Sequence, residues 1–442
     1  MADQLYFSRD SKLFVEWAGT TGVWEVPILD GFSFSQGTNA SEITLAEMED
    51  TSAVSRRGRR LFNDSLAPVE WSFSTYVRPF KSAGSANNDG IADATVNNHH
   101  AVEEVLWALM AGADTYSSST FSRTTNQHGG NGTVFTADTT DADISFQQSN
   151  RSSLPTATLY FVVSTAAANP VVYKINNAAV NEASIDFDVD GIATINWSGF
   201  GKEIVDFSGS VHRDATAPAT TGETTADGTA LADGEIWLDS DNDDAFHIVT
   251  DVSAGTYVRA IDEGTAATNN FIRNRLTSLA ITAGDATTFP GSSAGAYSLT
   301  LTGGNITITN NITYLVPEEL GTVNIPIENI TGARSVTGSF TCYLTLDDSD
   351  YATSGTSADF FNDLTSTAAL QKVVNEFDLT FAIGGTAGTP RLEIGMPKAH
   401  VEIPAHSIED VISLETTFHG LGSSISATDE VDVKYVGVTP TT

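Results

Sequence analysis

Residues 291–295, Gly-Ser-Ser-Ala-Gly, form one of the few stretches whose residue types could do chemistry. They match the Gly-x-Ser-x-Gly pattern of a serine nucleophile, which requires a strand before the serine and a helix after it. Pro290 precedes the pattern, and an alternating, strand-like run at 297–301 follows it. The sequence therefore predicts a turn here and no catalytic serine.

A cluster of acidic residues between Asp239 and Asp244 resembles the start of a calcium-binding loop. An EF-hand loop places glycine at its sixth position and glutamate at its twelfth. This chain has Asp244 and Thr250 at those positions. We expect a hairpin turn, and weak binding of a cation by the clustered carboxylates stays open.

The histidines do not show the spacing of a zinc site, which combines them with cysteines or with a second histidine on one helix face. No phosphate-binding loop or dinucleotide fingerprint is present either. We therefore expect no metal, no cofactor and no enzymatic activity. The enzymatic alternative is a carbohydrate-active β-sandwich, in which two carboxylates would lie about 5–10 Å apart in a cleft. The sequence cannot select such a pair among its 56 acidic residues. The histidines considered are His99, His100, His400, His406 and His419.

The charge balance of the chain is strongly acidic. Among 442 residues, 21 are basic and 56 are acidic, which gives a formal net charge of −35. Binding nucleic acid through phosphate neutralisation requires lysine and arginine, so this balance argues against it. It suits a protein that repels polyanions or stays soluble at high concentration. Many Thr, Val and Ile residues indicate a β-rich fold. No signal peptide or membrane anchor is expected, and the single Cys342 excludes an intrachain disulfide.

Two stretches about 220 residues apart resemble each other. They are residues 159–201 and 379–422. A period of this length indicates two copies of one module, not a solenoid. At an offset of 220, Leu159 falls on Leu379 and Phe161 on Phe381; one inserted residue later, Trp197 falls on Phe418, Gly199 on Gly420 and Gly201 on Gly422.

The similarity extends upstream, to the strand-like residues 73–77 and 340–344. Each copy then carries one helical segment, 99–112 in the first and 357–364 in the second. In the first segment apolar residues recur at helical spacing and form one stripe, which should pack on a sheet. These residues are Val102, Val105, Leu106, Leu109 and Met110.

The resulting fold prediction is mainly β, with two tandem modules built of β-sandwich or barrel-forming strands and one flanking α-helix each. Module 1 spans 1–204 and contains an insertion at 113–155 that module 2 lacks. Residues 205–270 form an acidic linker with a possible small β unit. Module 2 spans 271–442.

This order of elements resembles the tail tube proteins of long-tailed bacteriophages. Residues 26–36 and 42–45 at the start have that character, as do 403–414 and 418–422 near the end. The resemblance covers 1–204 and roughly 271–442, and it gives no role to the two insertions. It depends on pattern and module order.

The resemblance implies a structural virion protein whose modules close into a β-barrel around a channel. Two fused modules imply trimeric, pseudo-hexameric rings that stack into an acidic-lined conduit for DNA ejection. The implied partners are further copies, a tape measure protein, baseplate or tip and terminator proteins, and possibly a sheath. The implied location is the virion tail, with assembly in the host cytoplasm. The alternative is another self-assembling phage β-protein, such as a decoration protein, a fibre or an adhesin.

Three sets of residues have predicted roles within that scheme. A basic loop could contact an acidic face of the neighbouring ring or stay solvated; it contains Arg56, Arg57, Arg59 and Arg60. Candidate acids of the lumen are Glu42, Glu47 and Glu49, of which only the last two share a strand face. The predicted structural anchors of the repeat are Trp197, Gly199, Gly201, Phe418, Gly420 and Gly422.

Overall fold

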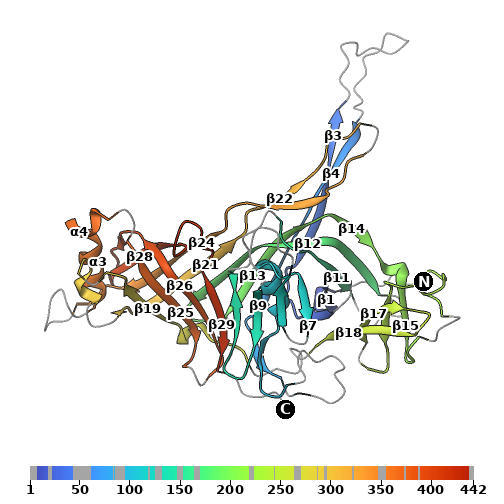
Figure 1. The fold of residues 1–442 in the computed structure, drawn as a ribbon, viewed down its shortest axis with the longest axis horizontal. Helices are drawn as coiled ribbons and strands as arrows, with labels where there is room; N and C mark the ends of the chain where they lie inside the picture. Colours follow the sequence, from blue (N-terminus) through green and yellow to red (C-terminus); the bar gives the residue numbers. More distant parts are fainter. Residues whose placement is uncertain are drawn as a thin grey trace, which may run out of the picture.

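A computed structural model describes most of the chain. The described residues are 7–17, 22–42, 61–82, 84, 95–117, 120–124, 132–146, 153–163, 170–218, 223–242, 244–262, 270–285, 287–292, 296–320, 323–346, 355–372, 375–386 and 389–437. As the sequence predicts, the fold is mainly β, and Figure 1 shows an elongated molecule with its sheets side by side.

The first half of the chain contains a set of strands that pack as two layers. They are β1 (Ser11–Glu16), β2 (Val23–Val26), β3 (Ser33–Glu42), β4 (Leu61–Tyr76), β11 (Ala157–Val163), β12 (Val171–Asp188), β13 (Thr194–Gly201) and β14 (Glu203–Asp206). The second half contains β19 (Ser278–Ala283), β20 (Tyr297–Ser298), β21 (Leu301–Thr309), β24 (Ser335–Tyr343), β25 (Phe377–Gly384), β26 (Arg391–Val401), β27 (Ala405–Ser407), β28 (Ser413–Gly420) and β29 (Asp432–Val436).

The two halves share one order of strand pairing. In the first half β2 pairs with β1, β1 with β11, β11 with β12, β12 with β13, β13 with β4 and β4 with β3. In the second half β20, β19, β25, β26, β28, β24 and β21 repeat these pairings in the same order. Even a register shift recurs, between Ala157 and Leu159 and between Phe377 and Leu379. Because both the order of strand pairing and this register shift recur, the two halves of the chain have the same topology.

The strand registers correct the sequence alignment near its end. Val180 pairs with Gly199, whereas Val401 pairs with Phe418, so Phe418 occupies the position of Gly199 and not that of Trp197. The backbone bonds agree with this shift: Val77 N–H donates to Ala193 and Leu344 N–H donates to Ile412, each at 2.9 Å. The hydrophobic pattern misled because its period of two is unchanged by a two-residue slip.

Two joints connect the halves. The second part of β12 pairs antiparallel with β21, from Glu182 opposite Thr309 to Asp188 opposite Gly303. At the other joint β29 lies between β26 and β10 (Asp141–Ser145). One apolar core runs through both halves, from Leu13 to Tyr435.

The helices are short. Residues predicted as a helix at 99–112 form β6 (His99–Ala101), which pairs with β5 (Pro79–Lys81), and then α1 (Glu104–Met110). Every residue of α1 is buried, so it does not present the predicted polar face to solvent. In the second half α3 (Ser357–Thr365) begins at a capping box formed by Thr356 and Asp359, and α4 (Thr367–Leu370) follows. No helix in the described ranges has the length and hydropathy needed to cross a membrane.

Both insertions fold as β structure. The first contributes β7 (Thr115–Ser117), β8 (Thr120–Arg123), β9 (Gly132–Ala137) and β10. The second contains β15 (Val211–Asp214), β16 (Ile236–Asp239), β17 (Ala245–Asp251) and β18 (Thr256–Ile261), which matches the predicted small β unit. This unit shares a core with β1 and β11, and β18 pairs with β2. It is the green and yellow part at the right of Figure 1.

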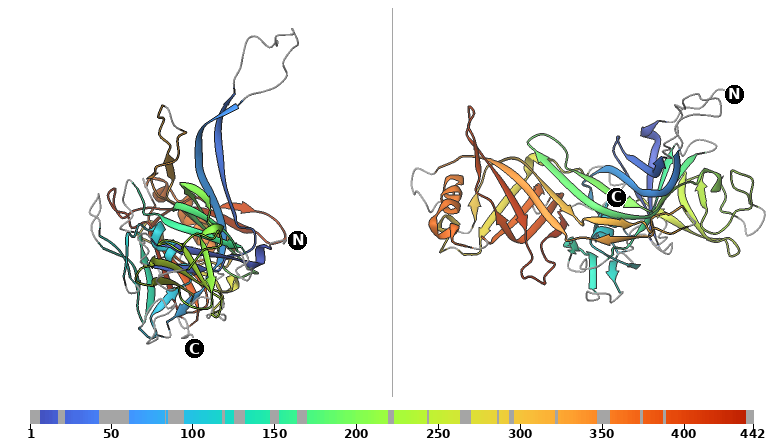
Figure 2. Two further views of the ribbon diagram at one scale, coloured as in Figure 1. Left: turned by 90° about the vertical axis from the view of Figure 1, so that its right-hand side faces the viewer. Right: turned by 90° about the horizontal axis from the view of Figure 1, so that it is seen from above.

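A long β-hairpin, β3 and β4, projects from the body, as Figures 1 and 2 show. The corresponding segment of the second half is the hairpin of β22 (Ile312–Leu315) and β23 (Glu328–Thr331). The two hairpins are joined by a hydrogen bond of 2.8 Å from Leu66 N–H to the Asn324 carbonyl.

Candidate functional site

One continuous sheet crosses the whole molecule. Its strands follow the order β3, β4, β13, β12, β21, β24, β28 and β27, so the β12–β21 joint lies near its middle. Side chains alternate between the two faces of a strand. One face of this sheet covers the core, with residues such as Trp71, Ile185, Ile306 and Phe340. The opposite face is the candidate functional site, and we call it the polar face.

The polar face consists almost entirely of hydroxyl, amide and carboxylate groups. Its charged members are acidic, and none of the described residues on it is lysine or arginine. The acids are Glu70, Glu182, Asp186, Asp188 and Glu415, and the neutral polar residues are Ser33, Ser35, Ser72, Ser74, Thr194, Asn196, Ser198, Ser184, Asn305, Thr307, Thr309, Ser335, Thr337, Ser339, Thr341, Ser413 and Thr417. Tyr76, Phe200, Tyr343 and His419 also lie on it.

Hydrogen bonds between neighbouring strands order these side chains. The Ser74 hydroxyl donates to Asn196 Oδ1 at 2.6 Å, and the Ser184 and Thr307 hydroxyls lie 3.0 Å apart across the β12–β21 joint. The Thr309 hydroxyl donates to Glu182 Oε2 at 3.2 Å. Cross-strand pairs of this kind stabilise the sheet.

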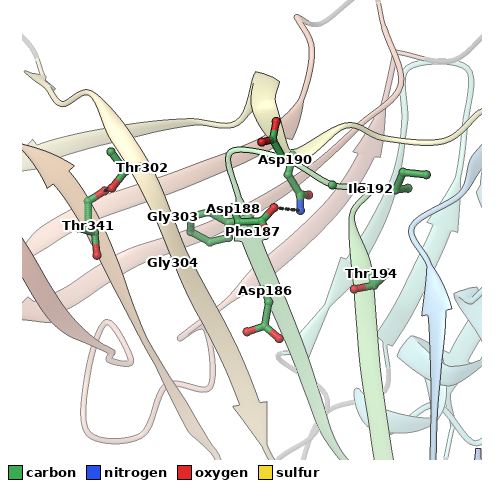
Figure 3. A pocket seen from close by; sticks show the side chains of 12 residues that line it. Asp186, Phe187, Asp188, Asp190, Ile192, Thr194, Thr302, Gly303, Gly304 and Thr341 are labelled. Carbon is green, nitrogen blue, oxygen red and sulfur yellow. Dashed lines mark hydrogen bonds between the residues drawn. The ribbon is translucent and has the colours of Figure 1, made fainter. Parts of the chain in front are cut away.

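A shallow acidic hollow lies over the joint between the halves. Figure 3 shows Asp186 and Asp188 on β12 together with Asp190 beyond it, opposite Thr302 and Thr341 of the second half. The Asn274 amide donates to Asp188 Oδ1 at 3.5 Å. The hollow thus concentrates negative charge on the polar face.

The two ends of this sheet are matched edges. At one end β3 pairs only with β4, and at the other β27 pairs only with β28, as far as the described strands show. The registers place Phe187 of β12 and Ile408 after β27 at equivalent positions. Phe187 is 3% exposed, whereas Ile408 is 79% exposed. An apolar side chain that is buried at the internal joint is therefore open at the sheet edge.

Of the predicted lumen acids, only Glu42 lies among the described residues, and it is not on the polar face. Glu42 is the exposed last residue of β3, on the projecting hairpin and away from the body of the sheet. Glu47 and Glu49 lie outside the described residues, as do Arg56, Arg57, Arg59 and Arg60. The acids of the polar face were missed because their strands were not assigned to faces; the alternation Glu182, Ser184, Asp186, Asp188 was the signal that could have found them.

The predicted anchors are close-packed. Trp197 is buried, its indole N–H donates to the Thr75 hydroxyl at 3.0 Å, and its ring lies 4.8 Å from that of Trp107. A Cβ on Gly199 would collide with the Ala179 carbonyl oxygen and with the Trp71 ring.

The second half exchanges the two partners of that aromatic–glycine contact. Phe418 is buried there, and its ring would lie 2.5 Å from a Cβ on Gly338. Gly201, Gly420 and Gly422 are also tightly enclosed: a Cβ would lie 2.6 Å from Ile175, 3.0 Å from Val336 and 2.8 Å from the Ala427 carbonyl, respectively.

A buried polar network that the sequence did not reveal connects α1 with the C-terminal strand. The Trp107 indole N–H donates to the Tyr435 hydroxyl at 2.7 Å, and that hydroxyl donates to Glu103 Oε1 at 2.6 Å. Burial raises the pKa of the Glu103 carboxyl to about 7, against the opposing effects of the Tyr435 hydrogen bond and the Arg78 charge. The network ties β29, and so the second joint, to the first half.

The motifs considered for catalysis and metal binding do not assemble into a site within the described residues. The 3-10 helix η5 (Pro290–Ser292) begins the Gly-Ser-Ser-Ala-Gly motif, and residues 293–295 lie outside the described residues. Asp239 and Asp244 flank the turn between β16 and β17, as expected. No group of three or more histidine, cysteine or acidic side chains in the described ranges is placed to hold a metal ion.

The fold and the polar face together define a β-rich protein whose continuous sheet has an open edge at each end among the described strands. No protein-family model matches the chain. The chain is similar to the tail tube protein pb6 of Escherichia phage T5, with 28% identity over 435 residues that cover 96% of this chain and 75% of that protein. The resemblance to phage tail tube proteins is confirmed by this similarity.

Proposed function

We propose that this protein is a structural subunit of a phage tail tube, whose rings of three chains form a conduit for DNA. The similarity to a tail tube protein supports the structural role and argues against an enzyme. The observation that carries the ring is the β12–β21 joint, because it joins two strands whose counterparts are the open edges of the same sheet.

The internal joint acts as a template for a joint between copies. The registers match residues 182–188 with 403–409, and residues 303–309 with 31–37. Residues 182–188 and 303–309 pair with each other within the chain. Their counterparts, 403–409 and 31–37, would therefore pair between chains. Residues 403–409 of one copy would add antiparallel to 31–37 of the next, as an extended segment adds to a free sheet edge.

The same template predicts the apolar contact. Phe187 is covered from the second half by Phe381, whose ring lies 5.6 Å away, and by Gly304. The counterparts of Phe381 and Gly304 are Phe161 and Phe32, whose rings stack 5.5 Å apart. The exposed Ile408 of one copy would therefore pack against Phe32 and Phe161 of its neighbour.

Three such joints would close the sheet into a barrel and remove both of its open edges. The polar face would then line the channel. Its acids and its lack of described basic residues suit the passage of DNA, because phosphates meet repulsion and no cationic partner. Two matched halves per chain would give a ring of three chains a pseudo-sixfold outline.

Stacking of the rings would build the tube, since the two faces of a head-to-tail ring differ and can polymerise. The projecting β3–β4 hairpin leads to Arg56, Arg57, Arg59 and Arg60, which we propose contact an acidic face of the next ring. We further propose that the chain is an internal duplication, with modules at 1–204 and 271–442. The protein would be assembled in the host cytoplasm and located in the virion tail. There it would contact the tape measure, baseplate or tip and terminator proteins.

Native mass spectrometry and negative-stain microscopy of the full-length protein test this function. We expect particles of three 46.7-kDa chains with a central hole and a sixfold outline, and stacks of them. Particles without a hole, or monomers at every concentration, would contradict the proposal and favour a decoration, fibre or adhesin role.

A further inference from the structure

The segment that leads into each half begins in the same way. The 3-10 helix η1 (Ser8–Asp10) precedes β1, and η4 (Asn274–Leu276) precedes β19. Leu13 and Leu279 hold equivalent registers, opposite Phe161 and Phe381, which sets the two segments 266 residues apart. Phe7 therefore corresponds to Arg273.

In the second half this leading segment has a defined place. It lies along the turn between β12 and β13, where Arg273 forms an antiparallel bridge with Ile192. Two backbone bonds flank the bridge: Ala193 N–H donates to the Ile272 carbonyl at 2.9 Å, and Asn274 N–H donates to the Gly191 carbonyl at 3.2 Å. The leading segment thus covers the end of the first half's sheet.

The counterpart of that turn is open. Residues 410–412, between β27 and β28, correspond to 191–193, and Val411 and Ile412 are exposed. The Leu344 N–H donates to the Ile412 carbonyl at 2.9 Å, as the Val77 N–H does to that of Ala193, so the two turns enter β28 and β13 in the same way, although the second turn is two residues shorter.

We propose that the N-terminal segment of a second copy, at Phe7–Asp10, adds as a short strand to residues 410–412 and covers Val411 and Ile412. Its own chain is not placed to supply the segment, because β1, which directly follows the segment, lies away from β28 with the strands of the joint between them (Figure 1). This inference rests on the proposed ring, in which the next copy brings its first half to this edge.

The chemistry of the two segments favours this contact. Phe7 is 52% exposed and Val411 is 59% exposed. The internal bridge pairs isoleucine with arginine, whereas the bridge between copies would pair two apolar side chains. Burying both would remove apolar surface from water at the rim of each joint.

A disulfide tests the contact directly. The internal bridge is a non-hydrogen-bonded antiparallel pair, in which Cα atoms lie about 4.5 Å apart, within the range that a disulfide spans. We would oxidise the full-length variant Phe7→Cys/Val411→Cys in assembled rings and separate the chains under denaturing, non-reducing conditions. The native Cys342 is buried, and burial raises the pKa of its thiol to about 11, so it should not compete.

We expect covalent species of two and three chains and none larger. The matched control is Phe7→Cys/Ile425→Cys, in which the second site is a fully exposed isoleucine elsewhere on the second half; it should stay monomeric. A second variant, Val411→Asp, should raise the protein concentration for half-maximal ring assembly about tenfold with an unchanged melting temperature.

The outcomes separate this inference from the proposed function. If the Phe7→Cys/Val411→Cys variant assembles into rings but forms no disulfide, the inference is wrong and the proposed function stands. A disulfide within one chain would also overturn it, as would species larger than three chains. If no variant and no wild-type protein forms rings, the proposed function fails and this contact fails with it.

Discussion

The β12 end of the first half and the β27 end of the second half are the same place in two equivalent sheets. At the first, Phe187 is buried under the second half of the chain; at the second, Ile408 is exposed. The second half of the chain lies beyond β12, whereas no described strand lies beyond β27. The strands themselves differ too, because β12 is continuous and its counterpart is divided into β26 and β27. The chain therefore displays both a closed joint and an open one, and the closed joint specifies what the open one would bind.

The largest effect should come from placing a charge at the open edge. We expect Ile408→Asp to abolish rings, because each of three joints would bury a carboxylate without a partner, at about 1–3 kcal/mol or more per joint. The folded monomer should be unaffected, since the side chain is exposed. Size-exclusion chromatography with light scattering measures the assembly.

Ile425→Asp is the control for that change, because Ile425 is also fully exposed but lies in the loop before β29. Equal loss of rings in both variants would mean that added charge alone prevents assembly. If Ile408→Asp assembles into rings as the wild-type protein does, the edge at residues 403–409 does not form the contact between chains.

Substituting the buried aromatic anchors should have the next largest effect, on folding and not on assembly. We expect Trp197→Ala and Phe418→Ala each to lower the free energy of unfolding by about 3–5 kcal/mol, because each leaves a cavity in the core. Urea unfolding of the monomer measures both. A near-neutral change at either position would show that its half tolerates the cavity and that the two cores are not comparable.

The β29 joint should respond to pH through Glu103. Its folded-state pKa of about 7 lies above the ordinary value of 4.5, so the protonated form is favoured in the folded protein. Stability is therefore full below about pH 4.5 and falls as the pH rises through about 7, by up to about 3 kcal/mol.

Glu103→Gln keeps an acceptor for the Tyr435 hydroxyl and carries no charge, so it should remove this part of the pH dependence. Thermal unfolding of both proteins from pH 4 to pH 8 measures the difference. Parallel curves would show that the buried carboxyl does not control the joint.

The exchanged aromatic–glycine contact gives a smaller test of the matched halves. Gly338→Ala should cost about 1–3 kcal/mol, because the new Cβ meets the Asn305 carbonyl and the Phe418 ring. Gly199→Ala should cost a similar amount, because its Cβ meets the Ala179 carbonyl and the Trp71 ring. Gly395→Ala is the control, since its nearest neighbour would lie 4.0 Å away. Chemical denaturation of the three variants should rank Gly395→Ala as the mildest.

The smallest effect should appear in transport through the channel. We expect Asp186→Lys/Glu415→Lys to slow DNA ejection several-fold, because cations on the polar face attract phosphates. Asp186→Asn/Glu415→Gln is the neutral control and should differ little from wild type. Ejection followed with a DNA-binding dye measures the rate, and equal rates in all three would argue against this face as the channel lining.

The sequence was sufficient to predict the β-rich class, because the alternation of apolar and polar residues reflects local rules, and it also showed the recurrence of Leu159–Phe161 at Leu379–Phe381. It misplaced Phe418 by two residues, since a period-two pattern fits equally well after such a slip. Helix α1 was predicted too long because His99–Ala101 pairs with Pro79–Lys81, a contact distant in sequence.

The parts of the site that depend on tertiary contacts could not be predicted. The polar face requires knowledge of which side of each strand covers the core, and the Glu103–Tyr435 bond joins residues 332 positions apart. The open edge was invisible for the same reason: both Phe187 and Ile408 are apolar, and only the tertiary contacts show that one is buried and the other exposed.

The most direct test of the matched joints is an electron cryomicroscopy map of the assembled protein at side-chain resolution. It should show three chains in each ring, with residues 403–409 of one chain antiparallel to 31–37 of the next and Ile408 beside Phe32 and Phe161. A ring in which the β3 edge is unpaired, or is paired with any segment other than 403–409, would contradict the account.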